Sequence, residues 1–246
     1  MQKRTFGLLG FPLTHSFSKP WFEKKFITEN LHDCSYENFA MPKIDGVKLL
    51  LDNPNLFGFN VTIPFKKEII PYLHHIHPVA QAVGAVNCVK RENEVWVGFN
   101  TDVIGFEMAL RPLLLSTTTS AIVLGSGGAY QAVAFVLKKL GINFITVSSR
   151  EKEGAIRYVH LTEAMVHSHT LIINTTPLGM FPKLDDCPLI PYNAISPDHI
   201  CFDLIYNPEE TLFLKKGKER GGRIQNGLRM LEIQAEESWQ IWQQNN

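Results

Sequence analysis

Ser120-Ala-Ile-Val-Leu-Gly125-Ser-Gly127-Gly128-Ala129-Tyr-Gln-Ala132 is the stretch of sequence that decides the fold. Residues 121–124 are apolar and partly β-branched, three glycines follow within four positions, and residues 132–140 are apolar enough for a buried helix. This order predicts a strand, a tight turn and a helix. At such a turn, unpaired backbone N–H groups meet the positive end of the helix dipole, and glycines leave room for a phosphate.

The glycine motif is incomplete, which leaves an alternative open. A turn of the form Gly-x-Gly-x-x-Gly would have a third glycine at position 130, where Tyr130 stands. The small residues Gly128, Ala129 and Ala132 would let the helix pack closely instead. Residues 125–129 therefore predict a nucleotide site, and the alternative is an ordinary strand-to-helix turn.

The end of the next strand indicates which nucleotide. Residues 143–148 read as a second strand, which is followed by Ser149 and Arg150. An acidic residue here would bond both ribose hydroxyls and select NAD, whereas a hydroxyl and a fixed cation suit a 2′-phosphate. The sequence therefore favours NADP over NAD, and Glu151, which follows directly, keeps NAD as the alternative.

Length and composition bound the class of protein. The chain has 246 residues, enough for one large domain or two small ones, and its 45% hydrophobic and 20% charged content is typical of globular proteins. Lys plus Arg and Asp plus Glu are 24 each, so no net field predicts a nucleic-acid or membrane partner. The start of the chain, broken by Gly7, Gly10 and Pro12, predicts a first strand rather than a signal peptide.

The cysteines and histidines predict neither a disulfide framework nor a metal site. Cys34, Cys88, Cys187 and Cys201 are far apart and form no Cys-x-x-Cys pair. Reduced thiols in a cytoplasmic protein are the simplest interpretation. His74-His75-Ile-His77 does not have a metal-ligand spacing, so we interpret it as a solvated helix end.

The remaining segments alternate between strands and helices. In the first half we expect strands at about 4–11, 35–41 and 57–63, helices at about 19–30 and 43–51, a hairpin over 84–100 and a helix at about 102–114. In the second half we expect strands near 121–125, 143–148, 170–174 and 200–205, and an amphipathic helix after Asn226. Residues 150–162 leave little room for a crossover helix. This alternation indicates an α/β layer followed by a separate, trimmed nucleotide unit.

Two serines follow the first strand. Ser16 and Ser18 stand beside a helix start, where hydroxyl groups and backbone donors can hold a carboxylate. The alternative is that either serine only caps the helix, which is the commoner role of serine at this position.

A lysine follows another strand of the first half. Pro64 fits the first turn of a helix, which would place Lys66 and Lys67 at the positive end of the helix dipole. That environment suits a lysine that moves a proton near neutral pH. The alternative is a solvated lysine pair neutralised by Glu68.

An aspartate begins the linking helix. Asp102 either caps that helix or, if its strand lies beside residues 60–63, meets Lys66 at one end of the sheet. The two would then form an acid–base pair facing the nucleotide turn. Asn87 lies in the intervening hairpin and would reach the same pocket. Such a pocket suits a small polyhydroxylated acid better than an apolar substrate.

Two segments of the second half carry weaker signals. Asn174-Thr175-Thr-Pro-Leu-Gly179-Met180 leaves a strand for a Pro/Gly turn, where backbone groups would meet a carboxamide. Gln234 falls near the edge of the apolar stripe of the C-terminal helix, so by itself it predicts a solvent-facing side chain.

Seven short segments, taken together and in order, resemble one family. They are Gly10-Phe-Pro-Leu-Thr-His-Ser16-Phe-Ser18, Asn60-Val-Thr-Ile-Pro-Phe-Lys66, Gly84-Ala-Val-Asn87, Asn100-Thr-Asp102, Gly125-Ser-Gly-Gly-Ala129, Asn174-Thr-Thr-Pro-Leu-Gly-Met180 and Asn226-Gly-Leu-Arg-Met-Leu-Glu-Ile-Gln234-Ala. In this combination they are similar to the shikimate dehydrogenase family over nearly the whole chain. The resemblance implies the NADPH-dependent reduction of 3-dehydroshikimate to shikimate, a step of chorismate and aromatic amino acid biosynthesis.

The resemblance also implies roles for individual residues. Lys66, oriented by Asp102, would give a proton to the oxygen that becomes negative as hydride arrives. The substrate would be bound by Ser16 and Ser18 at its carboxylate, and by Asn60, Thr62, Asn87, Tyr206 and Gln234. The cofactor would be bound by Gly125, Ser126, Gly127, Gly128, Ala129, Ser149, Arg150, Thr175, Leu204 and Gly227.

The implied architecture has two α/β domains. Residues 1–102, with a returning C-terminal helix over 227–246, would form the substrate-binding and catalytic domain, and residues 103–226 a Rossmann-like NADP-binding domain. The sequence departs from the family pattern at Lys19, Tyr130, Ser149 and Glu151. The substrate-binding domain therefore matches the family pattern better than the NADP-binding domain does.

Two other functions remain as alternatives. One is a quinate/shikimate dehydrogenase that uses NAD. The other is a nucleotide- or metabolite-binding module without turnover, because the cofactor half is trimmed. In either case we expect a small-molecule ligand, no metal, no nucleic acid and no membrane, a cytoplasmic location, and a monomer or homodimer.

Overall fold

The chain folds into two compact α/β units. The computed structural model describes residues 3–13 and 16–244, so that His15 of the first motif lies outside the described residues. Unit 1 consists of Met1–Ile104 together with Gln234–Asn246, and unit 2 is Gly105–Ile233. The division falls inside two helices, α4 (Asp102–Leu110) and α8 (Leu228–Gln243).

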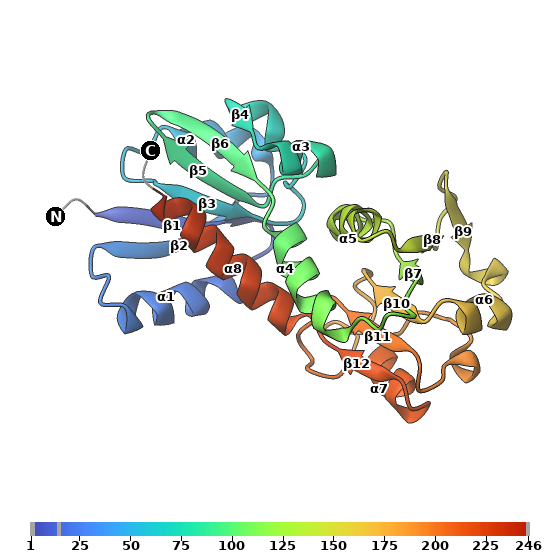
Figure 1. Cartoon of the computed structure of the whole chain (residues 1–246). Coiled ribbons are helices and arrows are strands. Elements are labelled where there is room, and N and C mark those ends of the chain that lie inside the picture. Colours follow the sequence, from blue (N-terminus) through green and yellow to red (C-terminus); the bar gives the residue numbers. More distant parts are fainter. Residues whose placement is uncertain (1–2, 14–15, 245–246) are drawn as a thin grey trace. The chain divides into compact units, whose positions relative to one another are not determined.

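Unit 1 is built on a mixed sheet (Figure 1). Its strands are β1 (Arg4–Gly10), β2 (Cys34–Ala40), β3 (Gly58–Val61), β4 (His75–Ile76), β5 (Cys88–Glu92) and β6 (Val95–Phe99), in the order β2-β1-β3-β5-β6-β4. Only β5 runs antiparallel to its neighbours. The carboxyl ends of β1, β3 and β6 therefore share one edge of the sheet, and β5 begins at that same edge.

The helices of unit 1 cover the sheet because the side chains of each strand alternate between its two faces. They are α1 (Ser18–Thr28), α2 (Val47–Leu51), α3 (Pro78–Val83) and the end of α8, with 3₁₀ turns at Ile44–Gly46 and Ile70–Tyr72. On β1, Phe6 belongs to one core cluster and Leu9 to another. Trp239 of α8 packs within 5.4 Å of the Phe6 ring and 5.3 Å of Phe26 of α1, so α1 and α8 cover the same face (Figure 1).

Unit 2 is built on an all-parallel sheet. Its strands are β7 (Ser120–Leu124), β8 (Asn143–Ser148), β9 (Ala155–Arg157), β10 (Leu171–Asn174), β11 (Ile200–Asp203) and β12 (Arg223–Gln225), in the order β12-β11-β10-β7-β8-β9. The helices are α5 (Gly128–Lys139), α6 (Glu163–Ser168) and α7 (Leu212–Glu219), with 3₁₀ turns at Arg111–Leu113, Tyr158–His160 and Tyr192–Ala194. Strand order reverses between β7 and β10, which is the doubly wound Rossmann arrangement. The predicted fold class is confirmed.

Most predicted elements are confirmed, with shifted ends. The strand, glycine turn and helix of residues 120–132 form β7 and the start of α5. The helix predicted over 102–114 ends as an α-helix at Leu110 and continues as a 3₁₀ turn, because Pro112 has no N–H to donate to the preceding turn. The helix predicted over 43–51 likewise starts as a 3₁₀ turn, and α2 begins only at Val47.

Two regions differ from the sequence interpretation. Residues 74–76 are not a helix end, because His75–Ile76 forms β4 beside the edge of β6, and the backbone N–H of His77 donates to the Gly98 carbonyl at 2.8 Å. Only His77 lies at a helix end, where its side chain accepts the N–H of Val79 and caps the start of α3. The segment after Arg150 holds no crossover helix, as expected. It contains the short strand β9, which extends the sheet beside β8.

Candidate active site

Lys66 and Asp102 meet at the carboxyl edge of the sheet in unit 1. Lys66 follows β3 and Asp102 follows β6, and these strands flank β5. The Lys66 Nζ atom lies 2.6 Å from Asp102 Oδ2. The two side chains keep 19% and 12% of their surface exposed, so the pair is largely buried yet open to a small molecule.

Lys66 is not held by a helix, which corrects the sequence expectation. Residues 63–69 form consecutive turns, in which the N–H of Ile69 donates to the Phe65 carbonyl at 2.9 Å. A macrodipole needs several successive aligned peptide groups, so Lys66 does not lie at the positive end of a helix dipole. Instead, the buried side chains of Phe65 and Ile69 anchor the turns. The Lys66 carbonyl also accepts the N–H of Val86 at 2.8 Å.

Asp102 does not cap the helix that it begins. The N–H of Val103 donates to Asn100 Oδ1 at 3.2 Å, so Asn100 takes the capping role that was the alternative for Asp102. Both carboxylate oxygens of Asp102 have other partners. Oδ2 accepts from Lys66, and Oδ1 accepts from Asn87 Nδ2 at 2.9 Å.

Asn87 is fixed in one orientation. Its Oδ1 accepts the backbone N–H of Thr101 at 2.6 Å, which forces Nδ2 toward Asp102 Oδ1 and toward Thr101 Oγ1 at 3.0 Å. The side chain is 2% exposed. Asn87, predicted to bind substrate, therefore donates both amide hydrogens to protein acceptors. It holds the carboxylate of the Lys66–Asp102 pair in place.

Asn60 is a second buried amide. Its Oδ1 accepts from Tyr36 Oη at 2.9 Å, and its Nδ2 donates to Ser238 Oγ at 2.8 Å and to the Asn87 carbonyl at 3.2 Å. Burial raises the pKa of Tyr36 well above its usual value, against the effect of a hydrogen bond with Ser18. The network therefore links Ser18, at the start of α1, to β3, the strand that precedes Lys66.

The other predicted substrate residues of unit 1 lie around the same edge. The Ser16 hydroxyl is buried and, within the described residues, has no hydrogen-bond partner. Thr62 directly follows β3, and its N–H donates to the Leu9 carbonyl at 2.9 Å. Gln234 is 8% exposed rather than solvent-facing, because its Oε1 accepts from Asn87 Nδ2 at 3.3 Å.

The glycine turn of unit 2 fits a dinucleotide phosphate. Gly125 has a φ of +100°, and a Cβ there would lie 2.7 Å from Thr175 Oγ1, so no other residue fits without strain. Gly127 begins α5 without a side-chain cap, and a Cβ on Gly127 or Gly128 would meet open space. The first N–H groups of α5 therefore face room for an anion. The turn lies where strand order reverses, the usual place for a nucleotide.

The remaining predicted cofactor residues lie at the carboxyl ends of unit 2 strands. Ser149 and Arg150 are exposed after β8. Thr175 follows β10, and its hydroxyl donates to the Leu124 carbonyl at 2.8 Å. Leu204 follows β11, and a Cβ on Gly227 would lie 2.0 Å from the Leu204 carbonyl oxygen, so glycine is required there. Tyr206, predicted to bind substrate, also lies in unit 2, and burial raises its pKa.

Three polar residues were missed by sequence reasoning. Thr101 and Ser238 complete the buried network of unit 1, with their hydroxyl oxygens 3.2 Å apart. Asp203 ends β11, and burial raises its pKa to about 6 although Thr211 Oγ1 donates to its carboxylate at 2.6 Å. A carboxylate at the end of an apolar strand is a signal that could have singled out Asp203.

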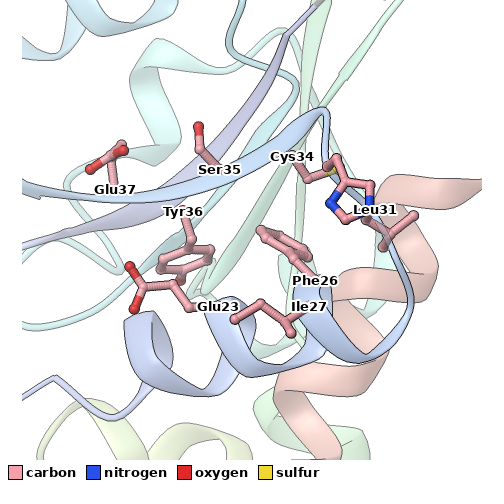
Figure 2. Close-up of a pocket in the computed structure, with 9 residues that line it drawn as sticks. Glu23, Phe26, Ile27, Leu31, Cys34, Ser35, Tyr36 and Glu37 are labelled. Atoms are coloured by element: carbon pink, nitrogen blue, oxygen red, sulfur yellow. The ribbon is translucent and has the colours of Figure 1, made fainter.

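The structure also contains a cavity that shares Tyr36 with the buried network of Asn60. It has a volume of about 390 Å³ and lies at α1 and β2, with Phe26 and Tyr36 between the two elements (Figure 2). Neither Lys66 nor Asp102 lines it. In residues 3–13 and 16–244, no cluster of histidine, cysteine or carboxylate side chains is arranged to hold a metal ion. No helix of this same part combines the length and apolarity that a membrane span requires.

The fold and the site define a class of protein: a two-unit α/β chain with a Rossmann unit and, in its other unit, a buried acid–base pair. A model of the shikimate dehydrogenase substrate-binding domain matches residues 8–89. A curated shikimate dehydrogenase (NADP(+)) from Methanococcus maripaludis strain C6 is 39% identical over 96% of this chain and 90% of its own length. The chain belongs to the shikimate dehydrogenase family.

Solved structures of shikimate dehydrogenases are also similar to this chain over nearly its whole length. Shikimate dehydrogenase from Aquifex aeolicus has a TM-score of 0.87 at 36% identity, covering 98% of this chain and 92% of that one. The Thermus thermophilus enzyme, solved in complex with NADP(H) and shikimate, has a TM-score of 0.86 at 30% identity, covering 98% of this chain and 93% of that one.

Proposed function

We propose that this protein is an NADP-dependent shikimate dehydrogenase, which reversibly reduces 3-dehydroshikimate to shikimate in chorismate and aromatic amino acid biosynthesis. The observation that carries the proposal is the 2.6 Å contact between Lys66 and Asp102, at the strand edge of a chain that belongs to this family. The Methanococcus maripaludis relative is named for NADP(+), and the Thermus thermophilus enzyme was solved with NADP(H) and shikimate.

Lys66 is the proposed proton donor. NADPH, when bound, supplies the hydride that reduces the substrate carbonyl. The carbonyl oxygen then becomes negative, and the Lys66 ammonium gives it a proton. In the reverse direction Lys66 takes the proton back from the hydroxyl. Asp102 keeps the ammonium in place, and Asn87 keeps the carboxylate in place through its bond to Oδ1.

The remaining unit 1 residues are proposed to bind the substrate. Ser16, with its unpartnered hydroxyl, and Ser18 would hold the carboxylate. Thr62 and Gln234 would bond the hydroxyl groups of the ring. The side-chain amides of Asn60 and Asn87 are hydrogen-bonded to other protein groups. We therefore propose that they mainly position the substrate-binding residues and the Lys66–Asp102 pair.

Unit 2 is proposed to bind the dinucleotide. The backbone of Gly125, Ser126, Gly127, Gly128 and Ala129 would meet the pyrophosphate at the start of α5. Ser149 and Arg150 would meet the 2′-phosphate, and Thr175, Leu204 and Gly227 would lie by the nicotinamide. Residues 1–102 with 227–246 would then act as the substrate domain and residues 103–226 as the NADP domain.

One observation favours a second candidate. Glu151 is exposed directly after Arg150, where a carboxylate would bond ribose hydroxyls and favour NAD. A quinate/shikimate dehydrogenase that uses NAD is therefore the alternative activity. A cytoplasmic location and a monomeric or homodimeric state remain predictions.

The test is a steady-state assay of the purified full chain. Shikimate or quinate is offered with NADP(+) or NAD(+), and the absorbance of the reduced nicotinamide is followed. We expect the highest kcat/KM with shikimate and NADP(+). Faster turnover with NAD(+) and quinate would establish the alternative. Nucleotide binding without any turnover of either acid would refute the proposed enzyme and leave a binding module.

A further inference from the structure

We propose that Lys152 is a specificity-determining residue that binds the 2′-phosphate of NADP, held in place by Tyr130. This proposal rests on the proposed function. It joins two features that depart from the family pattern or lie outside its motifs: the bulky Tyr130 in the glycine turn, and a lysine two positions after Arg150.

The contacts of Lys152 place its ammonium at the start of α5. Its Nζ donates to the backbone carbonyl of Ser126, inside the glycine turn, at 2.8 Å. The same nitrogen lies 5.5 Å from the centroid of the Tyr130 ring, within range of a cation–π contact. A side chain from the segment after β8 therefore folds back over the turn that is proposed to bind the dinucleotide.

Tyr130 is itself anchored. Its Oη lies 3.0 Å from Thr146 Oγ1 on β8, the strand that leads to Ser149 and Arg150. The ring is thus tied to the strand that ends at the proposed ribose site. A small residue at position 130 would offer Lys152 no aromatic face, so the departure at position 130 accounts for the placement of the lysine.

The place of Lys152 suits an anion. The positive end of a helix dipole disfavours a nearby cation, so the Ser126 carbonyl and the Tyr130 ring hold Lys152 where a bound negative group would stabilise it further. The backbone N–H groups of the turn are suited to the pyrophosphate. Lys152 comes from the segment that meets the ribose, so the 2′-phosphate is the anion that it would bind.

Lys152 also decides the charge of this segment. Arg150 and Lys152 are cations, whereas Glu151 and Glu153 are anions, so the four residues are neutral together. Without Lys152 the segment would carry a net negative charge, which repels a phosphate and favours the free ribose hydroxyls of NAD. The lysine thereby offsets Glu151.

The experiment measures nucleotide affinity by titration calorimetry on the full chain, without substrate. NADP(+) and NAD(+) are titrated into the wild type, Lys152→Gln and Tyr130→Phe. Lys138→Gln is the matched control, because Lys138 is an exposed lysine near the far end of the same helix. We expect Lys152→Gln to weaken NADP(+) binding about tenfold and to leave the Kd of NAD(+) unchanged, because one charge-assisted contact is lost. Lys138→Gln should bind both nucleotides like the wild type, whereas Tyr130→Phe, which loses the contact with Thr146, should weaken NADP(+) binding by less than Lys152→Gln does.

Three outcomes would overturn the proposal, each in a distinct way. An equal loss of affinity for NADP(+) and NAD(+) in Lys152→Gln would assign the lysine to the turn or the pyrophosphate. No change for either nucleotide would remove it from the site. A wild type that binds neither nucleotide would refute the proposed function itself, and with it any nucleotide role for Lys152.

Discussion

At the scale of single residues, the site depends on how one carboxylate is shared. Asp102 receives Lys66 on one oxygen and Asn87 on the other. Asn87 cannot turn over, because its Oδ1 is held by the Thr101 N–H. The orientation of the carboxylate toward Lys66 is therefore set, through Asn87, by the backbone N–H of Thr101, the residue that directly precedes Asp102. Such support by surrounding groups is what keeps an acid–base pair aligned.

The first prediction concerns this pair. Lys66→Ala removes the proposed proton donor, and Asp102→Asn removes the negative charge that holds it, so both should lower kcat by about 10²- to 10⁴-fold. Lys67→Ala is the matched control, because Lys67 is an exposed neighbour in the same run of turns. Steady-state assays measure kcat, and circular dichroism checks that the fold is kept. Full turnover in Lys66→Ala, or an equal loss in Lys67→Ala, would remove Lys66 from its proposed role.

The second prediction concerns the buried Asp203. Burial raises its pKa from 3.8 to about 6, so between these pH values the folded protein holds a proton that the unfolded chain has released. The free energy of unfolding should therefore fall as the pH rises from about 4 to about 6, by up to about 3 kcal/mol from this group. Asp203→Asn keeps the shape of the side chain without this titration.

Urea unfolding of the wild type and of Asp203→Asn at several pH values measures the effect. The difference between the two proteins isolates Asp203, because groups such as Glu107 titrate in both. Burial opposes ionisation of Glu107, but hydrogen bonds from Lys139 and Arg111 prevail and lower its pKa. The contribution of Glu107 to the free energy of unfolding is therefore lost as the pH falls, whereas that of Asp203 is lost as the pH rises. Parallel pH profiles for the two proteins would contradict the prediction for Asp203.

At the scale of elements, two glycines of the turn after β7 have different roles: Gly125 is needed for stability, and Gly127 for the proposed binding of the phosphate. In the third prediction, Gly125→Ala should destabilise unit 2 by about 1–3 kcal/mol, because its backbone is left-handed and a Cβ would collide with Thr175. Gly127→Ala should leave stability unchanged, because its φ is −82° and its Cβ meets open space. That Cβ would stand where the phosphate is proposed to bind, so NADP(+) affinity should fall.

Thermal unfolding and calorimetric titration of both variants measure the two effects. The variants serve as controls for each other, since they lie two residues apart in one turn. A Gly127→Ala protein that binds NADP(+) like the wild type would place the phosphate elsewhere. A Gly125→Ala protein with an unchanged Tm would contradict the steric argument.

The meeting of Lys66 and Asp102 could be predicted because it follows from topology. Polar residues after parallel strands gather at one edge of a sheet, whatever the details of their loops. The conformation around Lys66 could not be predicted in the same way. A proline fits the first turn of a helix and also fits an isolated turn, and only the burial of Phe65 and Ile69 selects the latter.

The polar side chains of α8 could not be placed from the sequence for a different reason. Gln234 and Ser238 lie beside the apolar stripe of their helix, where polar residues usually face solvent. Their partners, Asn60, Asn87 and Thr101, lie more than a hundred residues away in the chain. β9 was missed because three residues are too few to show a period.

At the scale of the whole molecule, each unit has its own sheet and its own core. All four tryptophans, Trp21, Trp96, Trp239 and Trp242, belong to unit 1. Tryptophan fluorescence therefore reports on unit 1 alone, whereas far-ultraviolet circular dichroism reports on the helices and strands of both units. The two probes together can tell which unit a ligand stabilises.

The fourth prediction uses this difference. Shikimate, proposed to bind mainly unit 1, should raise the unfolding midpoint seen by tryptophan fluorescence. NADP(+), proposed to bind unit 2, should raise the midpoint of the remaining transition seen by circular dichroism. A ligand at about one hundred times its Kd stabilises the state that binds it by about 2.7 kcal/mol, a shift of several degrees for a domain of this size. Heating scans of the full chain with each ligand alone measure both midpoints. Acetate at the same concentration as shikimate is the control for the added carboxylate. Equal shifts of both midpoints by both ligands would contradict the prediction. The two units would then unfold in a single cooperative transition, although each has its own core.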